Sequence, residues 1–128
     1  MDDRIRRSLT IAARVLLATA IVVTMYEATI RHPVNVELEQ GDKMLHALAF
    51  LGLSFLVDFA FPGEGFGFRK IILVIGYGVL IEAVQLFLPW RSTELADIVA
   101  DCAGIALYGL LIPLLRYFPL LRHRWYRD

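Results

Sequence analysis

Four long runs of apolar residues, separated by short polar segments, set the pattern of this chain. The runs lie at about residues 9–27, 43–61, 70–88 and 95–117. Each is close to the roughly 20 residues that a helix needs to cross a bilayer. The segments between the runs carry turn and helix-stopping residues, including Pro33, Gly41, Pro62, Gly63 and Pro89. The pattern predicts an all-α fold, a four-helix transmembrane bundle that forms a single domain over residues 1–128.

Two other architectures fit the pattern less well. The runs are too long for the strands of a membrane barrel and lack their alternation. A soluble helical bundle would need broad polar faces, yet residues 71–88 offer only Tyr77, Glu82 and Gln85 as clearly polar positions. Composition agrees with a membrane protein, because 58% of the residues are hydrophobic and mean hydropathy is +0.60, whereas soluble domains contain about 45 to 50% apolar residues. The net charge of zero provides no basic field, so we expect no nucleic-acid partner.

The basic residues are distributed unevenly along the chain and predict its orientation. The N-terminal segment, the second connection and the C-terminal segment hold ten of them, whereas the first and third connections hold Arg31, Lys43 and Arg91. Lys and Arg near helix ends favour the cytoplasmic side, so both termini are expected in the cytoplasm. Arg14 interrupts the first run and no A-x-A pattern follows it, which indicates an uncleaved anchor. The ten residues are Arg4, Arg6, Arg7, Arg14, Arg69, Lys70, Arg116, Arg122, Arg124 and Arg127.

Polar residues recur at helical spacing near the predicted outer ends of three runs. Residues three or four apart share one face of a helix, and at about 1.5 Å rise per residue Glu82 lies roughly 9 Å below Leu88. Three segments distant in sequence should therefore bring polar groups to one level of the membrane. The pairs are Asp42 with His46, Glu82 with Gln85, and Asp97 with Asp101.

This arrangement predicts a chemically unusual site. An ionised side chain at the bilayer centre costs about 2.5 to 3.5 kcal/mol, and converging carboxylates cannot all ionise without a cation or a proton. We therefore hypothesise that at least one carboxyl keeps its proton or coordinates a divalent metal, with His46, Glu82, Asp97 and Asp101 as candidate ligands. Simpler roles exist for single residues, since Asp42 suits an N-cap, Asp97 suits the first turn of a helix and His46 suits the interface. Asp58 is expected near the inner end, paired with Arg69 or Arg14.

The same polar residues form three motifs that occur in order along the chain. They are Asp42-Lys43-x-x-His46-x-x-Ala49-Phe50, Tyr77-Gly78-x-Leu80-Ile81-Glu82-x-x-Gln85-x-Phe87-x-Pro89-x-Arg91, and Asp97-x-x-Ala100-Asp101-x-x-Gly104. Together they resemble the VanZ-like family of membrane proteins over about residues 40–112. Many members of that family carry Asn where this chain has Asp101, so the resemblance gives less support to a mechanism that needs a carboxylate there.

The resemblance implies a multi-pass protein of the bacterial cytoplasmic membrane, with an association to glycopeptide resistance of the teicoplanin type. It also implies that the shared polar residues are the characteristic set, which we take as the candidate ligand-binding residues. The partners expected are membrane lipids and a lipid-linked envelope precursor or a lipoglycopeptide. The ligand-binding set is Asp42, Lys43, His46, Glu82, Gln85, Arg91, Asp97 and Asp101.

Three functions remain open from the sequence. The first is an outward-facing site that binds or protects an envelope component, with Lys43 and Arg91 contacting phosphate. The second is an intramembrane enzyme that modifies an envelope lipid or precursor, with His46, Glu82 and Asp97 as candidate catalytic residues. The third is a transporter or channel, which would require an oligomer because four helices leave little room for a pore.

Overall fold

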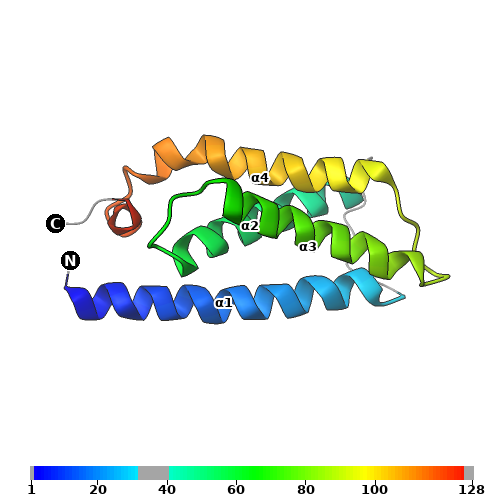
Figure 1. Ribbon diagram of the computed structural model, residues 1–128, viewed down its shortest axis with the longest axis horizontal. Coiled ribbons are helices and arrows are strands. Elements are labelled where there is room, and N and C mark those ends of the chain that lie inside the picture. Colours follow the sequence, from blue (N-terminus) through cyan, green and yellow to red (C-terminus); the bar gives the residue numbers. More distant parts are fainter. Residues whose placement is uncertain (1, 32–40, 126–128) are drawn as a thin grey trace.

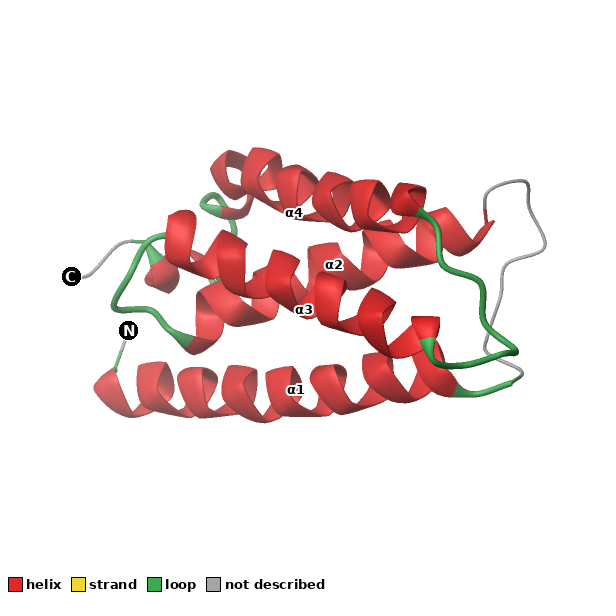
Figure 2. Cartoon of the chain, turned by 45° about the vertical axis from the view of Figure 1, so that its right-hand side comes forward, coloured by secondary structure: helices red, strands yellow, loops and turns green. Residues whose placement is uncertain are grey.

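The computed structural model describes residues 2–31 and 41–125 and shows four long helices in the predicted order (Figure 1). The described residues contain no strand (Figure 2), so the all-α prediction is confirmed. Part of the first predicted connection, at residues 32–40, and the basic residue Arg127 lie outside the described residues. The elements are α1 (Asp3–Thr29), α2 (Gly41–Ala60), α3 (Phe68–Leu86), α4 (Leu95–Leu115) and a short 3-10 turn, η1 (Arg122–Arg124).

Helix α1 differs most from its predicted limits, because it begins at Asp3 instead of residue 9. Asp2 caps it: the Asp2 carboxylate accepts a hydrogen bond of 3.1 Å from the backbone N–H of Arg4. The arginine-rich segment before the apolar run is therefore helical. The prediction took the start of the apolar run at residue 9 as the start of the helix, whereas the helix begins at its N-cap, Asp2.

Helix α2 is the centre of the bundle. It packs most extensively against α4 and next against α1, while α3 makes smaller contacts with the other three helices. Gly104 of α4 permits the closest approach, because a Cβ atom there would overlap the carbonyl oxygen of Ala47 and lie 2.9 Å from the backbone nitrogen of Leu51. Small residues at such positions let the backbones of membrane helices pack closely.

The start of α1 and the η1 turn after α4 lie at one end of the bundle, together with the connection between α2 and α3 (Figure 1). We call this the termini end. The opposite end carries the connection between α3 and α4 and the start of α2, and we call it the loop end. This arrangement agrees with the four predicted crossings, because an even number of crossings returns the chain to the side of the membrane where it began.

The outer surface of the described bundle is apolar and its interior contains polar groups. Helices α1, α2 and α4 are long and apolar enough to cross a membrane. Helix α3 is set apart by three charged residues within its 19 residues, Arg69, Lys70 and Glu82. Lys70 and Glu82 are nevertheless buried, and large apolar residues of α3 such as Leu73 and Leu80 are exposed. Such a distribution is typical of a protein whose surroundings are lipid.

A buried ion-pair network joins α2 to the C-terminal segment at the termini end. The carboxylate of Asp58 is fully buried, and it accepts contacts from Lys70 Nζ at 2.9 Å, Arg124 Nη2 at 2.6 Å and the hydroxyl of Tyr108 at 2.6 Å. The expected pairing of Asp58 with Arg69 or Arg14 is therefore wrong. Those two arginines bind elsewhere, at the carboxylate of Glu64 and the carbonyl oxygen of Ala60.

Candidate functional site

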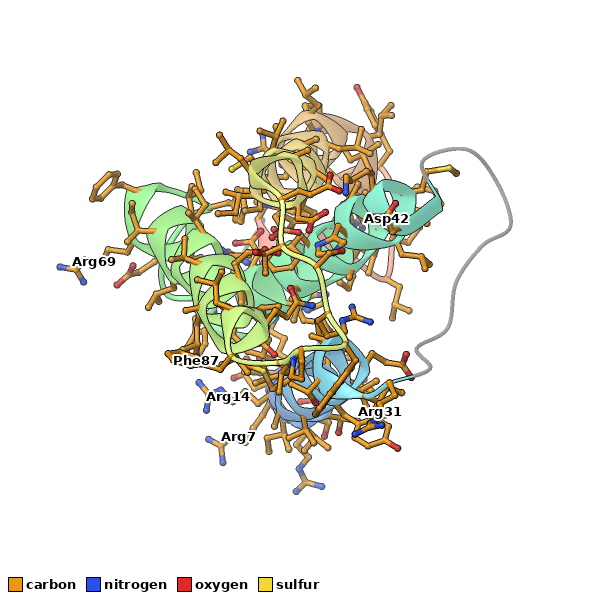
Figure 3. The ribbon with its side chains drawn as sticks, turned by 90° about the vertical axis from the view of Figure 1, so that its right-hand side faces the viewer. Arg7, Arg14, Arg31, Asp42, Arg69 and Phe87 are labelled. Atoms are coloured by element: carbon orange, nitrogen blue, oxygen red, sulfur yellow. The ribbon has the colours of Figure 1, made fainter. Side chains whose placement is uncertain are left out.

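The loop end gathers the predicted polar residues from three helices. Asp42, Lys43 and His46 lie in the first two turns of α2, and Asp97 and Asp101 occupy the same place in α4. Glu82 and Gln85 come from the last turns of α3. Figure 3 looks onto this end, with Asp42 labelled on α2. We call the following residues the polar cluster: Asp42, Lys43, His46, Glu82, Gln85, Glu94, Asp97 and Asp101.

Lys43 is surrounded by carboxylates. Its ammonium lies 2.6 Å from Asp97 Oδ1, 2.8 Å from Asp42 Oδ2 and 3.1 Å from Glu94 Oε2. The Asp97 carboxylate is buried, whereas those of Asp42 and Glu94 are exposed. Since an ammonium has three N–H donors, Lys43 has no donor left for a further anion.

His46 of α2 pairs with the carboxylate of Asp101 of α4. Its Nδ1 atom lies 2.8 Å from Oδ1 of Asp101, whose residue is only 2% exposed. Gly78 of α3 makes room for that carboxylate, because a Cβ atom there would lie 2.7 Å from Asp101 Oδ2. The pair fixes the orientation of the imidazole ring and leaves its Nε2 atom available.

Glu82 is the least satisfied member of the polar cluster. Its side chain is buried, and Oε1 has no hydrogen-bond partner among the described residues. One ligand atom each from His46, Glu82 and Asp97 lie within 4.8 Å of one another. A buried polar atom without a partner needs a proton, a water molecule or an ion to satisfy it.

Acidic groups outnumber basic ones in the polar cluster. Five carboxyl groups, those of Asp42, Glu82, Glu94, Asp97 and Asp101, face one lysine and one histidine. Such an excess of like charge is stable away from bulk water only if protons or cations compensate for it. The polar cluster is therefore suited to binding a cation or to donating a proton.

A cavity of about 810 Å³ lies above the polar cluster at the loop end. Its rim includes Arg31 and Trp90, whose guanidinium and indole ring stack 4.6 Å apart. The indole N–H of Trp90 donates to the carbonyl oxygen of Thr29 at 2.8 Å, which holds the α3–α4 connection against α1. The polar lining residues are Thr24, Glu27, Arg31, Asp42, Lys43, His46, Gln85, Arg91, Ser92, Glu94 and Asp97.

Arg91 and Gln85 present polar groups to this cavity. Within the described part of the chain, the Arg91 guanidinium makes no hydrogen bond and no ion pair. Gln85 donates from Nε2 to the carbonyl oxygen of Ala28 at 3.0 Å, while its buried Oε1 has no partner within the same part. The cavity therefore offers a free guanidinium and a free amide oxygen beside the carboxylates.

The structure brings all eight predicted site residues to this one end of the bundle. Six of them line the cavity, namely Asp42, Lys43, His46, Gln85, Arg91 and Asp97. Asp101 pairs with His46, and Glu82 approaches His46 and Asp97. Three further residues, Arg31, Trp90 and Glu94, were not predicted; Glu94 precedes the first turn of α4 as its N-cap residue, a position that the spacing to Asp97 could have indicated. That the eight predicted residues bind a ligand stays a prediction.

The fold and this buried polar cluster define a small helical membrane protein. The chain belongs to the VanZ/LLP1 family, whose model matches residues 5–116. The match confirms the resemblance seen in the three motifs and extends it from about residues 40–112 across α1. Comparison with curated proteins and with solved structures finds no significant match.

Proposed function

We propose that this VanZ-like protein spans the bacterial cytoplasmic membrane four times and binds the phosphate-bearing headgroup of an envelope lipid in the loop-end cavity. The observation that carries the proposal is the cavity itself, which combines the unpaired guanidinium of Arg91 with an opening at the end of an apolar bundle. Its volume of about 810 Å³ falls within the roughly 300 to 1,000 Å³ typical of small-molecule sites.

The orientation of the site follows from the basic residues. Arg4, Arg6 and Arg7 in α1 and Arg122 and Arg124 in η1 belong to the termini end, which the positive-inside rule assigns to the cytoplasm. The loop end then faces outward. A fourth crossing by α3 is supported by its length of 19 residues, which corresponds to about 28 Å of helix.

Arginine chemistry favours a phosphate ligand over a neutral one. A guanidinium offers two parallel N–H donors that match two phosphate oxygens, and no described residue accepts a hydrogen bond from the guanidinium of Arg91. The expected contribution of Lys43 to phosphate binding is reduced, because three carboxylates already surround its ammonium. Arg31, stacked on Trp90 at the cavity rim, supplies a second cation that can reach the same headgroup.

A titration of detergent-purified protein with polyprenyl monophosphate tests the proposal. We expect saturable binding to the wild type and a loss of about tenfold or more in Arg91→Ala, since a hydrogen bond to a charged group contributes about 1.5 to 3 kcal/mol. Arg69→Ala is the matched control, because this exposed arginine lies at the termini end and, among the described residues, pairs with Glu64. Equal affinity of wild type and Arg91→Ala, or equal binding of phosphatidylcholine, would overturn the proposal.

The family association adds a second ligand class to the same experiment. A lipoglycopeptide of the teicoplanin type carries both an acyl chain and a polar peptide, so it shares the amphipathic character of an envelope lipid. Binding of teicoplanin that Arg91→Ala abolishes, without binding of the polyprenyl phosphate, would assign the cavity to the drug and contradict the lipid proposal.

A second candidate function, an intramembrane enzyme, is favoured by the His46–Asp101 pair. A carboxylate that orients one imidazole nitrogen leaves the other to accept or donate a proton, and Glu82 and Asp97 lie within reach of that ring. Arg91 would then stabilise developing negative charge. Incubation with an envelope lipid followed by lipid mass spectrometry tests this candidate: a product formed by the wild type and not by His46→Gln supports it, and an unchanged lipid contradicts it.

A further inference from the structure

We propose that His46, Glu82 and Asp97 form a binding site for one divalent cation of the first transition series, such as Zn²⁺ or Mn²⁺, beneath the cavity. The proposal concerns the polar cluster itself and does not depend on which lipid or drug enters the cavity. His46, Glu82 and Asp97 would bind the ion, and Asp101 would hold His46 in position.

The three side chains have the spacing that a shared ion requires. Their ligand atoms lie within 4.8 Å of one another, and they come from α2, α3 and α4. Ligands at about 2.0 to 2.2 Å from a tetrahedral zinc ion lie about 3.3 to 3.6 Å apart. Side-chain rotations that shorten the separations by up to about 1.5 Å would therefore close the three ligands around one ion.

An independent observation points to a missing ligand at this position. Glu82 is only 8% exposed, and its Oε1 atom has no partner among the described residues. Every other carboxylate of the polar cluster has a basic partner, either Lys43 or His46. A cation bound by Glu82 would satisfy this oxygen and offset part of the acidic excess.

The neighbouring contacts leave suitable atoms free. Because Asp101 occupies Nδ1 of His46, the remaining Nε2 atom is the one that can bind a metal. Lys43 occupies Oδ1 of Asp97 at 2.6 Å, which leaves Oδ2 for the ion. A carboxylate behind a metal-binding histidine is the usual way in which proteins fix the ring and raise its basicity.

This geometry assigns Asp101 to positioning instead of ligation. The sequence suggested four candidate ligands including Asp101, but its Oδ1 atom is already bound to His46 and its Oδ2 atom faces Gly78. Three protein ligands would leave an open coordination position, next to the cavity that His46 and Asp97 line. Imidazole with two carboxylates suits Zn²⁺ and Mn²⁺ better than Ca²⁺ or Mg²⁺, which prefer oxygen ligands alone.

Metal analysis of the full chain tests the site directly. Protein purified in chelator-treated detergent is dialysed against Zn²⁺ or Mn²⁺ alone, and bound metal is measured by mass spectrometry and by calorimetric titration. We expect one ion per wild-type chain and a loss of at least tenfold in affinity for Glu82→Gln and His46→Gln. Glu64→Gln is the matched control, because this exposed carboxylate pairs with Arg69 at the termini end and lies outside the polar cluster, and it should bind as the wild type does.

A further variant distinguishes ligand from positioning residue. Asp101→Asn should retain stoichiometric metal with an affinity lowered by about 10- to 100-fold, the usual effect of removing a second partner from a metal-binding histidine. Failure of the wild type to bind either ion would overturn the proposal, as would unchanged binding in Glu82→Gln. Loss of metal in Glu64→Gln equal to that in Glu82→Gln would also overturn it, because binding would then follow the overall charge of the chain and not the three ligands.

Discussion

Nδ1 of His46 lies 2.8 Å from Oδ1 of Asp101, although the two residues are 55 positions apart in the sequence. This contact ties the second turns of α2 and α4 together at the loop end and holds the imidazole close to Glu82 and Asp97. It depends on two close approaches, of the Asp101 side chain to Gly78 and of the α2 backbone to Gly104. The geometry of the polar cluster is therefore sensitive to changes at residues that bear no polar side chain.

Gly78→Ala should disturb the polar cluster without removing any of its groups. A Cβ atom at this position would lie 2.7 Å from Asp101 Oδ2 and 3.2 Å from the ring of Phe50, so overpacking should cost about 1 to 3 kcal/mol. The measurement is thermal unfolding in detergent. Gly76→Ala on the same helix is the control, because nothing lies within 4 Å of its added atom and Ala favours a helix by up to about 1 kcal/mol; equal stability of the two variants would contradict the packing around Asp101.

Gly104→Ala should destabilise the bundle more than Gly78→Ala does. The added atom would meet backbone, the carbonyl group of Ala47 and the nitrogen of Leu51, and a helix backbone cannot rotate away as a side chain can. We expect α4 to separate from α2, with a lowered unfolding temperature in detergent. Gly109→Ala, also in α4 and with open space around it, should unfold like the wild type. A stable Gly104→Ala variant would show that α2 and α4 are not in backbone contact.

Asp58→Ala should be strongly destabilising. The substitution leaves Lys70 and Arg124 buried without the carboxylate that both of them contact, and removing one partner of a buried ion pair costs about 3 to 5 kcal/mol. Limited proteolysis of the C-terminal segment reports the loss, because Arg124 holds that segment on α2. Glu64→Gln breaks only the exposed pair with Arg69 and should change stability by about 1 kcal/mol or less; equal effects of the two substitutions would contradict this account.

The proposed orientation predicts which end of the bundle reagents can reach. In a variant whose native Cys102 is replaced by Ala, a cysteine at Ser92 should react with a membrane-impermeant thiol reagent added to intact cells. A cysteine at Gly65, in the connection at the termini end, should react only after the membrane is opened. The reverse pattern would place the polar cluster on the cytoplasmic side and contradict the orientation.

Much of this architecture could be predicted from the sequence because the bilayer imposes simple rules. Apolar runs of sufficient length specified the helices, and i, i+4 spacing placed Asp42 with His46 and Asp97 with Asp101 on shared faces. The depth in the membrane at which these pairs meet could be predicted from the rise per residue of a helix.

The partners of individual side chains could not be predicted in this way. Arg124 reaches Asp58 because the segment after α4 folds back onto the bundle through η1, and no periodicity encodes such a return. The pairing of Lys43 with Glu94 depends on the path of the α3–α4 connection, and the room for Asp101 depends on the absence of a side chain at Gly78. These features depend on tertiary packing, which local patterns do not contain.

The most direct test of the central claim, that the loop-end cavity binds a phosphate-bearing envelope lipid, is native mass spectrometry of the protein extracted gently from its own membrane. The account predicts a stoichiometric adduct with the mass of a phosphate-bearing isoprenoid or glycolipid in the wild type and in Arg69→Ala, and its loss in Arg91→Ala. Adducts of bulk phospholipid alone, or the same adduct in Arg91→Ala as in the wild type, would contradict it.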